Sequence, residues 1–400
     1  MLDNFVHIPK SSGSTLRTIL SRQYGVDHIL YFEPASPSWK GTSPADFLRE
    51  KLKKGTIDLI TGHHPFGIHA LIGSPCRSFS IIRDPIARAL SDYYYAYNYK
   101  LHRLRAEILE GSLSAEQFLV SPRFGMQQAQ TGMLAGRLVG PGDVFEAAFE
   151  NTKHCFAAVG TAERFEESVL YVAKTLGWRP PLFVKKNVTR LAPDIEQARK
   201  IAEATARVQY RDHFALEYKI YAHVDALLSE RINAEGEPFK RALEAYRGIQ
   251  SEIVSASTDE IYQLYEFRET DKLPPFAERF VGSEPYRTIA EYLDSGPPAK
   301  PQPRNYVGFV DRMAGSTIAG WAQDLWRDDP IEVCIYRAGS LIATQRSDRP
   351  REDVGRAHGG RSNVGFHVEL AEPIDDPAKY RICFEGTALQ VWNAGSSSQL

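Results

Sequence analysis

The sequence predicts an α/β protein with a parallel sheet flanked by helices, followed by a small C-terminal antiparallel β-sandwich. Two observations support this prediction. Residues 1–232 alternate short apolar runs with helical patterns, which is typical of βαβ units. After a proline-rich stretch at 296–304, the chain changes to short strand-like runs separated by Gly, Asp and Pro, as in a sandwich.

The length of 400 residues is more than one typical hydrophobic core accommodates. We therefore expect an α/β domain over 1–232, a helical extension with a linker over 233–303, and a β-sandwich domain over 304–400. The linker ends in GPPAKPQPR, and proline-rich segments of this kind form semi-rigid spacers between domains.

Short apolar runs mark the expected strands of the parallel sheet, and helical periodicity marks the helices between and after them. The expected strands are 5–8, 57–60, 79–82 and 157–160. The expected helices include 163–177, which should end at Gly177, and 195–232, 239–249, 258–267 and 284–293. Strand-like runs of the terminal domain are 306–310, 316–321, 331–336, 341–344, 365–370, 380–384 and 389–392.

The composition gives no global indication of a nucleic-acid partner, because 48 Lys and Arg residues face 50 Asp and Glu residues. Any anion site must therefore be built locally. The four cysteines are scattered without metal-ligand spacing, which indicates reduced or buried thiols. With neither a signal peptide nor an apolar run of ~20 residues, we expect a cytoplasmic protein without a membrane span.

The segment 7–16, HIPKSSGSTL, joins an expected strand to an expected helix. Backbone N–H groups and the macrodipole favour an anion at a helix N-terminus. Small residues allow a close backbone approach, while hydroxyls and a lysine add donors and charge. The candidate residues are Lys10, Ser11, Ser12, Gly13, Ser14 and Thr15. An ordinary serine N-cap is the alternative. The lysine precedes the glycine, unlike the order GxxxxGK[ST] of nucleotide P-loops.

The segment 81–95, IIRDPIARALSDYYY, provides a second candidate anion site. Arg83 follows a strand, and Pro85 suits the first turn of a helix. Ser91 lies about two helical turns beyond Arg83, so both side chains can approach one ligand. The planar guanidinium fork of arginine suits a phosphate dianion. A surface Arg–Asp pair at a helix start is the alternative.

Together these two segments resemble the motifs of the PAPS-dependent sulfotransferase superfamily, where PAPS is 3′-phosphoadenosine 5′-phosphosulfate. The nearest branch contains heparan sulfate 2-O-sulfotransferases and bacterial relatives, and the resemblance covers about residues 4–230. It implies a P-loop-like sulfotransferase fold. It also implies that residues 10–15 hold the 5′-phosphosulfate, while Arg83 and Ser91 hold the 3′-phosphate. Ser12 stands where relatives usually have glycine. The pair Lys185-Lys186 resembles a late basic loop that covers the nucleotide, although a solvated basic turn would look the same.

The segment 61–69, TGHHPFGIH, resembles the family's segment in which the histidine after glycine is the general base. The resemblance therefore implies His63 as the base, with His64 the nearest alternative and His69 a more distant one. Histidine suits proton transfer at neutral pH, although a structural role stays open for each. Lys10 would also stabilise charge on the leaving group. No metal is expected.

The resemblance implies sulfuryl transfer from PAPS to a hydroxyl acceptor, with adenosine 3′,5′-bisphosphate as the product. The acceptor is expected to be a carbohydrate or glycoconjugate, although a peptide or small metabolite stays open. A P-loop kinase-like phosphotransferase and a non-catalytic glycan-binding or scaffold protein are the alternatives. The terminal segment resembles a small β-domain appended to bacterial carbohydrate-modifying enzymes. Its tryptophans 321, 326 and 392 either stack on a sugar or pack internally.

Overall fold

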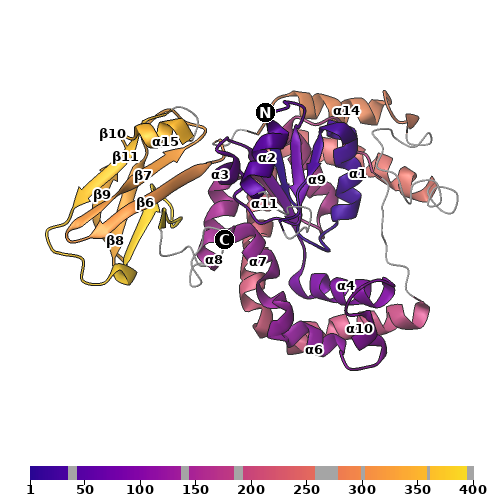
Figure 1. Ribbon diagram of the computed structural model, residues 1–400. Helices are drawn as coiled ribbons and strands as arrows, with labels where there is room; N and C mark the ends of the chain where they lie inside the picture. The colour runs from indigo at the N-terminus through magenta and orange to yellow at the C-terminus, as the bar shows by residue number, and fades with distance from the viewer. Residues whose placement is uncertain are drawn as a thin grey trace.

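The computed structural model describes residues 1–34, 43–136, 144–183, 192–256, 278–298, 302–357 and 361–393. They form an α/β domain (residues 1–298) and a β-domain (residues 302–393), which lie side by side in Figure 1. Within these ranges, we find no helix with the length and apolar character that crossing a membrane requires.

The α/β domain is built on a parallel sheet of five strands in the order β2-β3-β1-β4-β5. The strands are β1 (Asp3–Val6), β2 (Ile29–Tyr31), β3 (Leu59–Gly62), β4 (Arg77–Ile82) and β5 (Phe156–Thr161). Strand β1 is central and pairs with β3 on one side and β4 on the other. Because all five strands are parallel, their carboxyl ends form one edge of the sheet, which we call the carboxyl edge.

The α/β class and the parallel sheet are confirmed, and each of the four expected strands overlaps one in the structure. The first strand ends at Val6 rather than at residue 8, so the loop that follows is longer than expected. Strand β2 was not expected, because its three residues are too short to show a period. The helix after β5 ends before Gly177, which has the left-handed φ of 72° that favours glycine.

Helices cover both faces of the sheet, so neighbouring strand residues enter different cores. Phe5 lies in one apolar cluster with Leu16 and Val169, whereas Val6 lies in another with Leu134 and Val224. The shorter helices are α1 (Gly13–Tyr24), α2 (Pro44–Leu52), α3 (Ile68–Ile72), α4 (Pro85–Asn98), α5 (Arg105–Leu109), α6 (Ala115–Val120), α7 (Ala129–Ala135), α8 (Val144–Glu150), α9 (Phe165–Leu176), α10 (Pro193–Gln209), α14 (Glu284–Asp294) and α15 (Glu352–Ala357).

Helix α11 (Ala215–Ala256) is the longest helix that the structure describes, and it is interrupted at Gly236, where φ is 65°. The part after this kink buries Phe239 and Tyr246 in the same cluster as Phe5 of the central strand. Helix α14 adds Ile289 to that cluster. The helical extension therefore packs on the sheet of the α/β domain. The expected helix at 258–267 lies outside the described residues.

The β-domain contains two sheets, with strand orders β10-β11-β7-β6-β13 and β12-β8-β9. Its strands are β6 (Tyr306–Ala314), β7 (Thr317–Asp324), β8 (Glu332–Arg337), β9 (Ser340–Arg346), β10 (Arg349–Pro350), β11 (Asn363–Glu369), β12 (Tyr380–Phe384) and β13 (Trp392–Asn393). All pairs are antiparallel except β13 with β6. Ile318 and Phe366 of one sheet share an apolar cluster with Ile335 and Ile382 of the other, as expected of a sandwich.

Internal packing accounts for Trp321 and for three of the four cysteines. Trp321 is buried among Val307, Leu325 and Val354, so it does not form an open stacking surface. The four cysteines are free thiols, and three of them are buried. Burial raises the pKa of the Cys76 thiol to about 12, which keeps it protonated at neutral pH.

The two domains meet at a seam formed by residues 66–76 and 147–155 of the α/β domain and residues 304–307 and 384–390 of the β-domain. Several hydrogen bonds cross it. The His69 ring donates to the Tyr306 carbonyl (3.2 Å), the Cys76 amide to the Asn305 side chain (2.9 Å), and the Arg304 amide to the His154 carbonyl (2.9 Å). Apolar residues of both domains share one buried cluster, so the β-domain packs directly against the α/β domain.

Candidate functional site

The three segments singled out in the sequence follow three adjacent strands of the sheet. Residues 7–12 follow β1, residues 63–67 follow β3, and residues 83–84 follow β4. In an open parallel sheet, ligands bind outside the carboxyl ends of the strands. Helices α4, α6 and α10 lie below the sheet in Figure 1, on the side where these loops emerge. The fold thus brings segments up to about 75 residues apart to one edge.

The loop after β1 turns sharply before helix α1. Lys10 and Ser12 both have left-handed backbone conformations, with φ of 66° and 63°. The Leu16 amide donates to the Ser12 carbonyl (3.1 Å), so the first helical turn starts at Ser12. Left-handed residues are found in the curved turns whose N–H groups converge on an anion, and they carry strain in residues other than glycine. Ser14 and Thr15 lie in the first turn of α1.

Gly13 is required by the close approach of the His7 ring. A Cβ at position 13 would lie 1.7 Å from the His7 Nε2 atom, which no side chain could occupy. Burial and, to a smaller extent, the neighbouring His63 lower the pKa of His7 to about 3. His7 is therefore neutral at physiological pH and fills the space beneath the loop.

Lys10 and Arg83 bring the first and second motifs into direct contact. The Arg83 Nη1 atom donates to the Lys10 carbonyl at 3.2 Å, so the two loops meet across the β1–β4 pair. The Lys10 ammonium lies 4.1 Å from the centre of the Tyr95 ring on α4. Burial lowers the pKa of both Lys10 and Arg83, while the acidic residues Asp92 and Glu163 oppose the shifts. Two partly buried cations therefore face one region.

Asp84 has an anchoring function and does not form a surface pair with Arg83. Its carboxylate caps α4 by accepting from the Ala87 amide (2.9 Å) and pairs with Arg207 of α10 (2.6 Å). The Asp84 amide donates to Glu163 (3.0 Å). The alternative to an anion site was a surface Arg–Asp pair at the start of this helix. It does not describe Asp84, because the Asp84 side chain is buried. Ser91 is half-buried and lies two turns into α4.

His63 is the exposed histidine of the 61–69 segment. Its Nδ1 atom lies 2.8 Å from the His7 carbonyl oxygen. Because a carbonyl oxygen only accepts, Nδ1 of the neutral ring carries the proton and Nε2 has the lone pair. The residue before His63 must be glycine, because a Cβ atom at position 62 would lie 2.0 Å from the Phe32 carbonyl oxygen. The geometry leaves Nε2 available as a proton acceptor.

The two other histidines of this segment are buried. His64 is 1% exposed and contacts the Phe32 ring. His69 is 4% exposed and donates to Tyr306 across the seam, and burial lowers its pKa to about 4. Neither side chain reaches solvent at the carboxyl edge.

One polar residue that connects both anion loops was not identified from the sequence. Gln130 of α7 is fully buried and bonds to the Arg83 backbone and the Ser11 hydroxyl. From the sequence, the three glutamines 127, 128 and 130 are expected on a helix, either as a polar face, which we favour, or as a lining of the acceptor cleft. The candidate Lys186 lies outside the described residues. Within the described ranges, His, Cys, Asp and Glu side chains form no group of three that could hold a metal.

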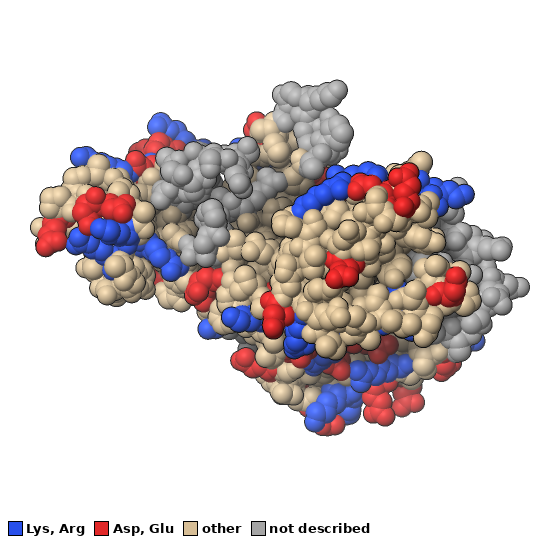
Figure 2. Space-filling view, turned by 90° about the horizontal axis from the view of Figure 1, so that it is seen from below, with Lys and Arg blue, Asp and Glu red and all other residues tan. Residues whose placement is uncertain are grey.

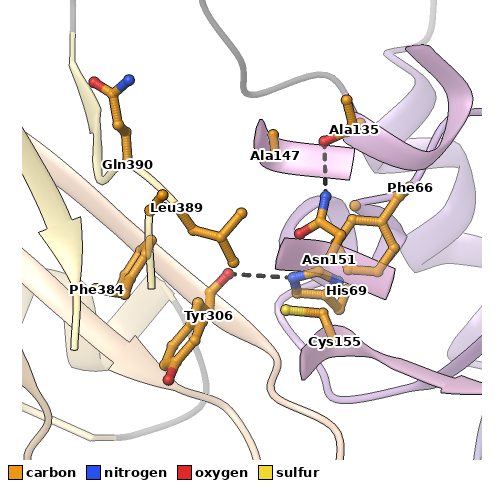
Figure 3. Close-up of a pocket in the computed structure, with 13 residues that line it drawn as sticks. Phe66, His69, Ala135, Ala147, Asn151, Cys155, Tyr306, Phe384, Leu389 and Gln390 are labelled. Atoms are coloured by element: carbon orange, nitrogen blue, oxygen red, sulfur yellow. Dashed lines mark hydrogen bonds between the residues drawn. The ribbon is translucent and has the colours of Figure 1, made fainter. Parts of the chain in front are cut away.

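A cavity of about 70 Å³ lies at the seam between the domains and apart from the anion loops. Figure 3 shows Phe66, Tyr306, Phe384 and Leu389 around it, with the His69 and Asn151 side chains bonded to backbone carbonyls. The lining is mainly apolar and includes no Lys or Arg. This cavity therefore lacks the charges that a nucleotide requires.

The face of the molecule seen in Figure 2 carries charges of both signs. On the face in Figure 2, Lys and Arg side chains are interspersed with Asp and Glu. Several form ion pairs within or between the helices, as Arg199 does with Glu196 and Arg123 with Glu107.

No family model and no curated protein matches this chain. The case for a function therefore depends on the carboxyl edge itself.

Proposed function

We propose that this protein is a PAPS-dependent sulfotransferase with a hydroxyl acceptor, which we expect to be a carbohydrate or glycoconjugate. The observation that carries the proposal is the contact between the Lys10 turn and Arg83, which sets two cationic loops side by side at the carboxyl edge. A nucleotide with a phosphosulfate at one end and a phosphate at the other matches two such loops. His63 follows the adjacent strand β3, which supports a proton acceptor nearby.

In this proposal the start of α1 holds the 5′-phosphosulfate. The backbone N–H groups of the turn and the helix macrodipole favour the anion, and Ser14 and Thr15 supply hydroxyls close to it. Arg83 and Ser91 hold the 3′-phosphate through a guanidinium fork and a hydroxyl. Partial burial strengthens each interaction, because less water screens the charges.

The chemistry is an in-line displacement at sulfur. The Nε2 atom of His63 takes the proton of the acceptor hydroxyl as its oxygen bonds to sulfur. The bond between sulfur and the bridging oxygen breaks, and its electron pair stays on adenosine 3′,5′-bisphosphate. The Lys10 ammonium stabilises the negative charge that develops on that oxygen. The His7 carbonyl keeps the proton on Nδ1, so the ring cannot present the wrong nitrogen.

The test separates binding from turnover. We expect adenosine 3′,5′-bisphosphate to raise the melting temperature of the wild type, and Arg83→Ala to reduce its affinity by roughly 10- to 100-fold. His63→Ala should leave that affinity unchanged and reduce turnover of radiolabelled PAPS by ~10²–10⁴-fold. His28→Ala is the matched control, since His28 is exposed and lies at the start of β2, on the opposite edge.

Three outcomes would contradict the proposed activity, and a fourth would contradict the role of His63. A wild type that ignores the bisphosphate is not a PAPS enzyme. A response to ATP with Mg²⁺ and none to the bisphosphate would favour a phosphotransferase. Binding of the bisphosphate without turnover on any polysaccharide, glycolipid, peptide or metabolite would favour a non-catalytic protein. If His63→Ala and the wild type turn over equally, the base is a different residue.

A further inference from the structure

Gln130 connects the two anion loops through its side-chain amide. Its Oε1 accepts from the Arg83 amide at 2.8 Å, and its Nε2 donates to the Arg83 carbonyl at 2.8 Å. The same Oε1 lies 3.5 Å from the Ser11 hydroxyl. Gln130 is 0% exposed, so water cannot replace any of these partners.

The backbone of Arg83 needs this partner because it lies beyond the end of β4 (Arg77–Ile82), where strand pairing has stopped. Buried backbone N–H and C=O groups are almost always paired in folded proteins. One planar amide supplies both the acceptor and the donor, so it fixes the orientation of the Arg83 backbone as well as its position.

Gln130 is itself held by a buried carboxylate. Glu217 of α11 is 0% exposed and accepts from the Gln130 amide (3.1 Å), the Thr131 amide (2.8 Å) and the Thr131 hydroxyl (2.7 Å). The buried Arg88 of α4 interacts with this carboxylate electrostatically: burial lowers the pKa of Arg88, and Glu217 opposes that shift. The start of α7 is therefore fixed against α11 and the Arg83 backbone, and Gln130 has little freedom to swing away.

We propose that Gln130 is a positioning residue that sets the separation of the Lys10 turn from Arg83, and that this separation selects nucleotides with anionic groups at both ends. Arg83 binds one end, and the loop that contains Ser11 binds the other. A one-ended nucleotide such as adenosine 5′-monophosphate uses only one loop, so its binding does not depend on their separation. This inference rests on the proposed function and adds a determinant of ligand selectivity.

The test is the ratio of two affinities, measured by calorimetry. In Gln130→Met, which keeps the side-chain volume and removes the amide, the affinity for adenosine 3′,5′-bisphosphate should fall by roughly tenfold or more. The affinity for adenosine 5′-monophosphate should change by less than about threefold. Gln128→Met is the matched control, since Gln128 is an exposed glutamine of the same segment. A purely structural role would lower both affinities together.

The remaining outcomes separate a failure of the role proposed for Gln130 from a failure of the proposed function. An equal affinity ratio in the wild type and Gln130→Met overturns the role of Gln130 and leaves the proposed function intact. A wild type that does not bind the bisphosphate overturns the proposed function and this selectivity with it. If Gln130→Met does not fold, Gln130→Asn serves instead, because its amide is one methylene too short to reach Arg83. In either folded variant, hydrogen exchange at the Arg83 amide should accelerate, and unchanged exchange would contradict the contact.

Discussion

The carboxyl edge and the seam between the domains differ in what their contacts do. At the edge, two residues other than glycine have left-handed backbones, and cations are held partly buried beside one another. At the seam, aromatic rings stack and backbone groups find partners in the opposite domain. Strain tends to collect at functional sites and to be offset elsewhere in a fold. The seam joins the two domains through packing and paired backbone groups, and the strained, charged edge supports the proposal of a ligand site there.

One short segment belongs to both regions. Residue 63 lies at the edge, Phe66 lines the seam cavity, and His69 donates to the β-domain. The Phe66 amide also donates to the Met133 carbonyl (2.9 Å), which ties the segment to α7. The predictions below test whether the two regions act independently in spite of this link.

The largest effect is expected from Phe384→Ala at the seam. Phe384 is 5% exposed and stacks on Tyr306 with ring centres 4.7 Å apart, so its loss leaves a hole beside the existing cavity. We expect the free energy of unfolding to fall by about 3–5 kcal/mol, measured by urea denaturation. Leu341→Ala, at an exposed position of the same domain, should change it by less than about 0.5 kcal/mol.

The same variants sharpen the comparison when ligand affinity is measured under folded conditions. If the regions are independent, folded Phe384→Ala binds adenosine 3′,5′-bisphosphate as the wild type does. A parallel loss of affinity would show that the seam holds the edge in place through the 63–69 segment.

A smaller effect is expected on the pH dependence of the free energy of unfolding, to which buried His69 contributes. Burial lowers its folded pKa to about 4 from an ordinary value of 6.5, so the unfolded chain binds the proton more readily. The contribution of neutral His69 to stability is complete above pH 6.5 and is lost as the pH falls toward 4, by up to about 3 kcal/mol. In His69→Gln, urea denaturation between pH 7.5 and 4.5 should show a correspondingly weaker loss. An identical pH slope in both proteins would exclude His69 as the source.

The smallest effect is expected from Ser12→Gly at the edge. Ser12 has φ of 63°, which glycine adopts without the steric cost that serine has. Part of this gain is offset by the greater freedom of glycine in the unfolded chain. We expect a net stabilisation of about 0.5–1 kcal/mol with nucleotide affinity preserved. Ser14→Gly in the first turn of α1 should instead destabilise the protein by a similar amount. Destabilisation by both substitutions would contradict strain at Ser12.

Local patterns in the sequence were enough to predict the sheet and the loops that follow its strands. Apolar runs located β1, β3, β4 and β5, and the Ser/Gly run located the start of α1. The sequence offered three neighbouring histidines as the general base, and only their burial in the folded protein narrows the choice. That burial depends on Phe32 and Tyr306, which are distant in the sequence. The link from Gln130 to the anion loops could not be predicted, because its partners Ser11 and Glu217 are 119 and 87 residues distant in the sequence.

This long-range network has a consequence for how the protein is made. The turn at residues 7–12 is synthesised before α11, yet it is braced through Gln130 by a carboxylate on that helix. A nascent chain arrested on the ribosome before Glu217 emerges would display every motif of the carboxyl edge without the brace that aligns them. Nucleotide capture by such arrested chains should therefore begin only once α11 has emerged and can dock.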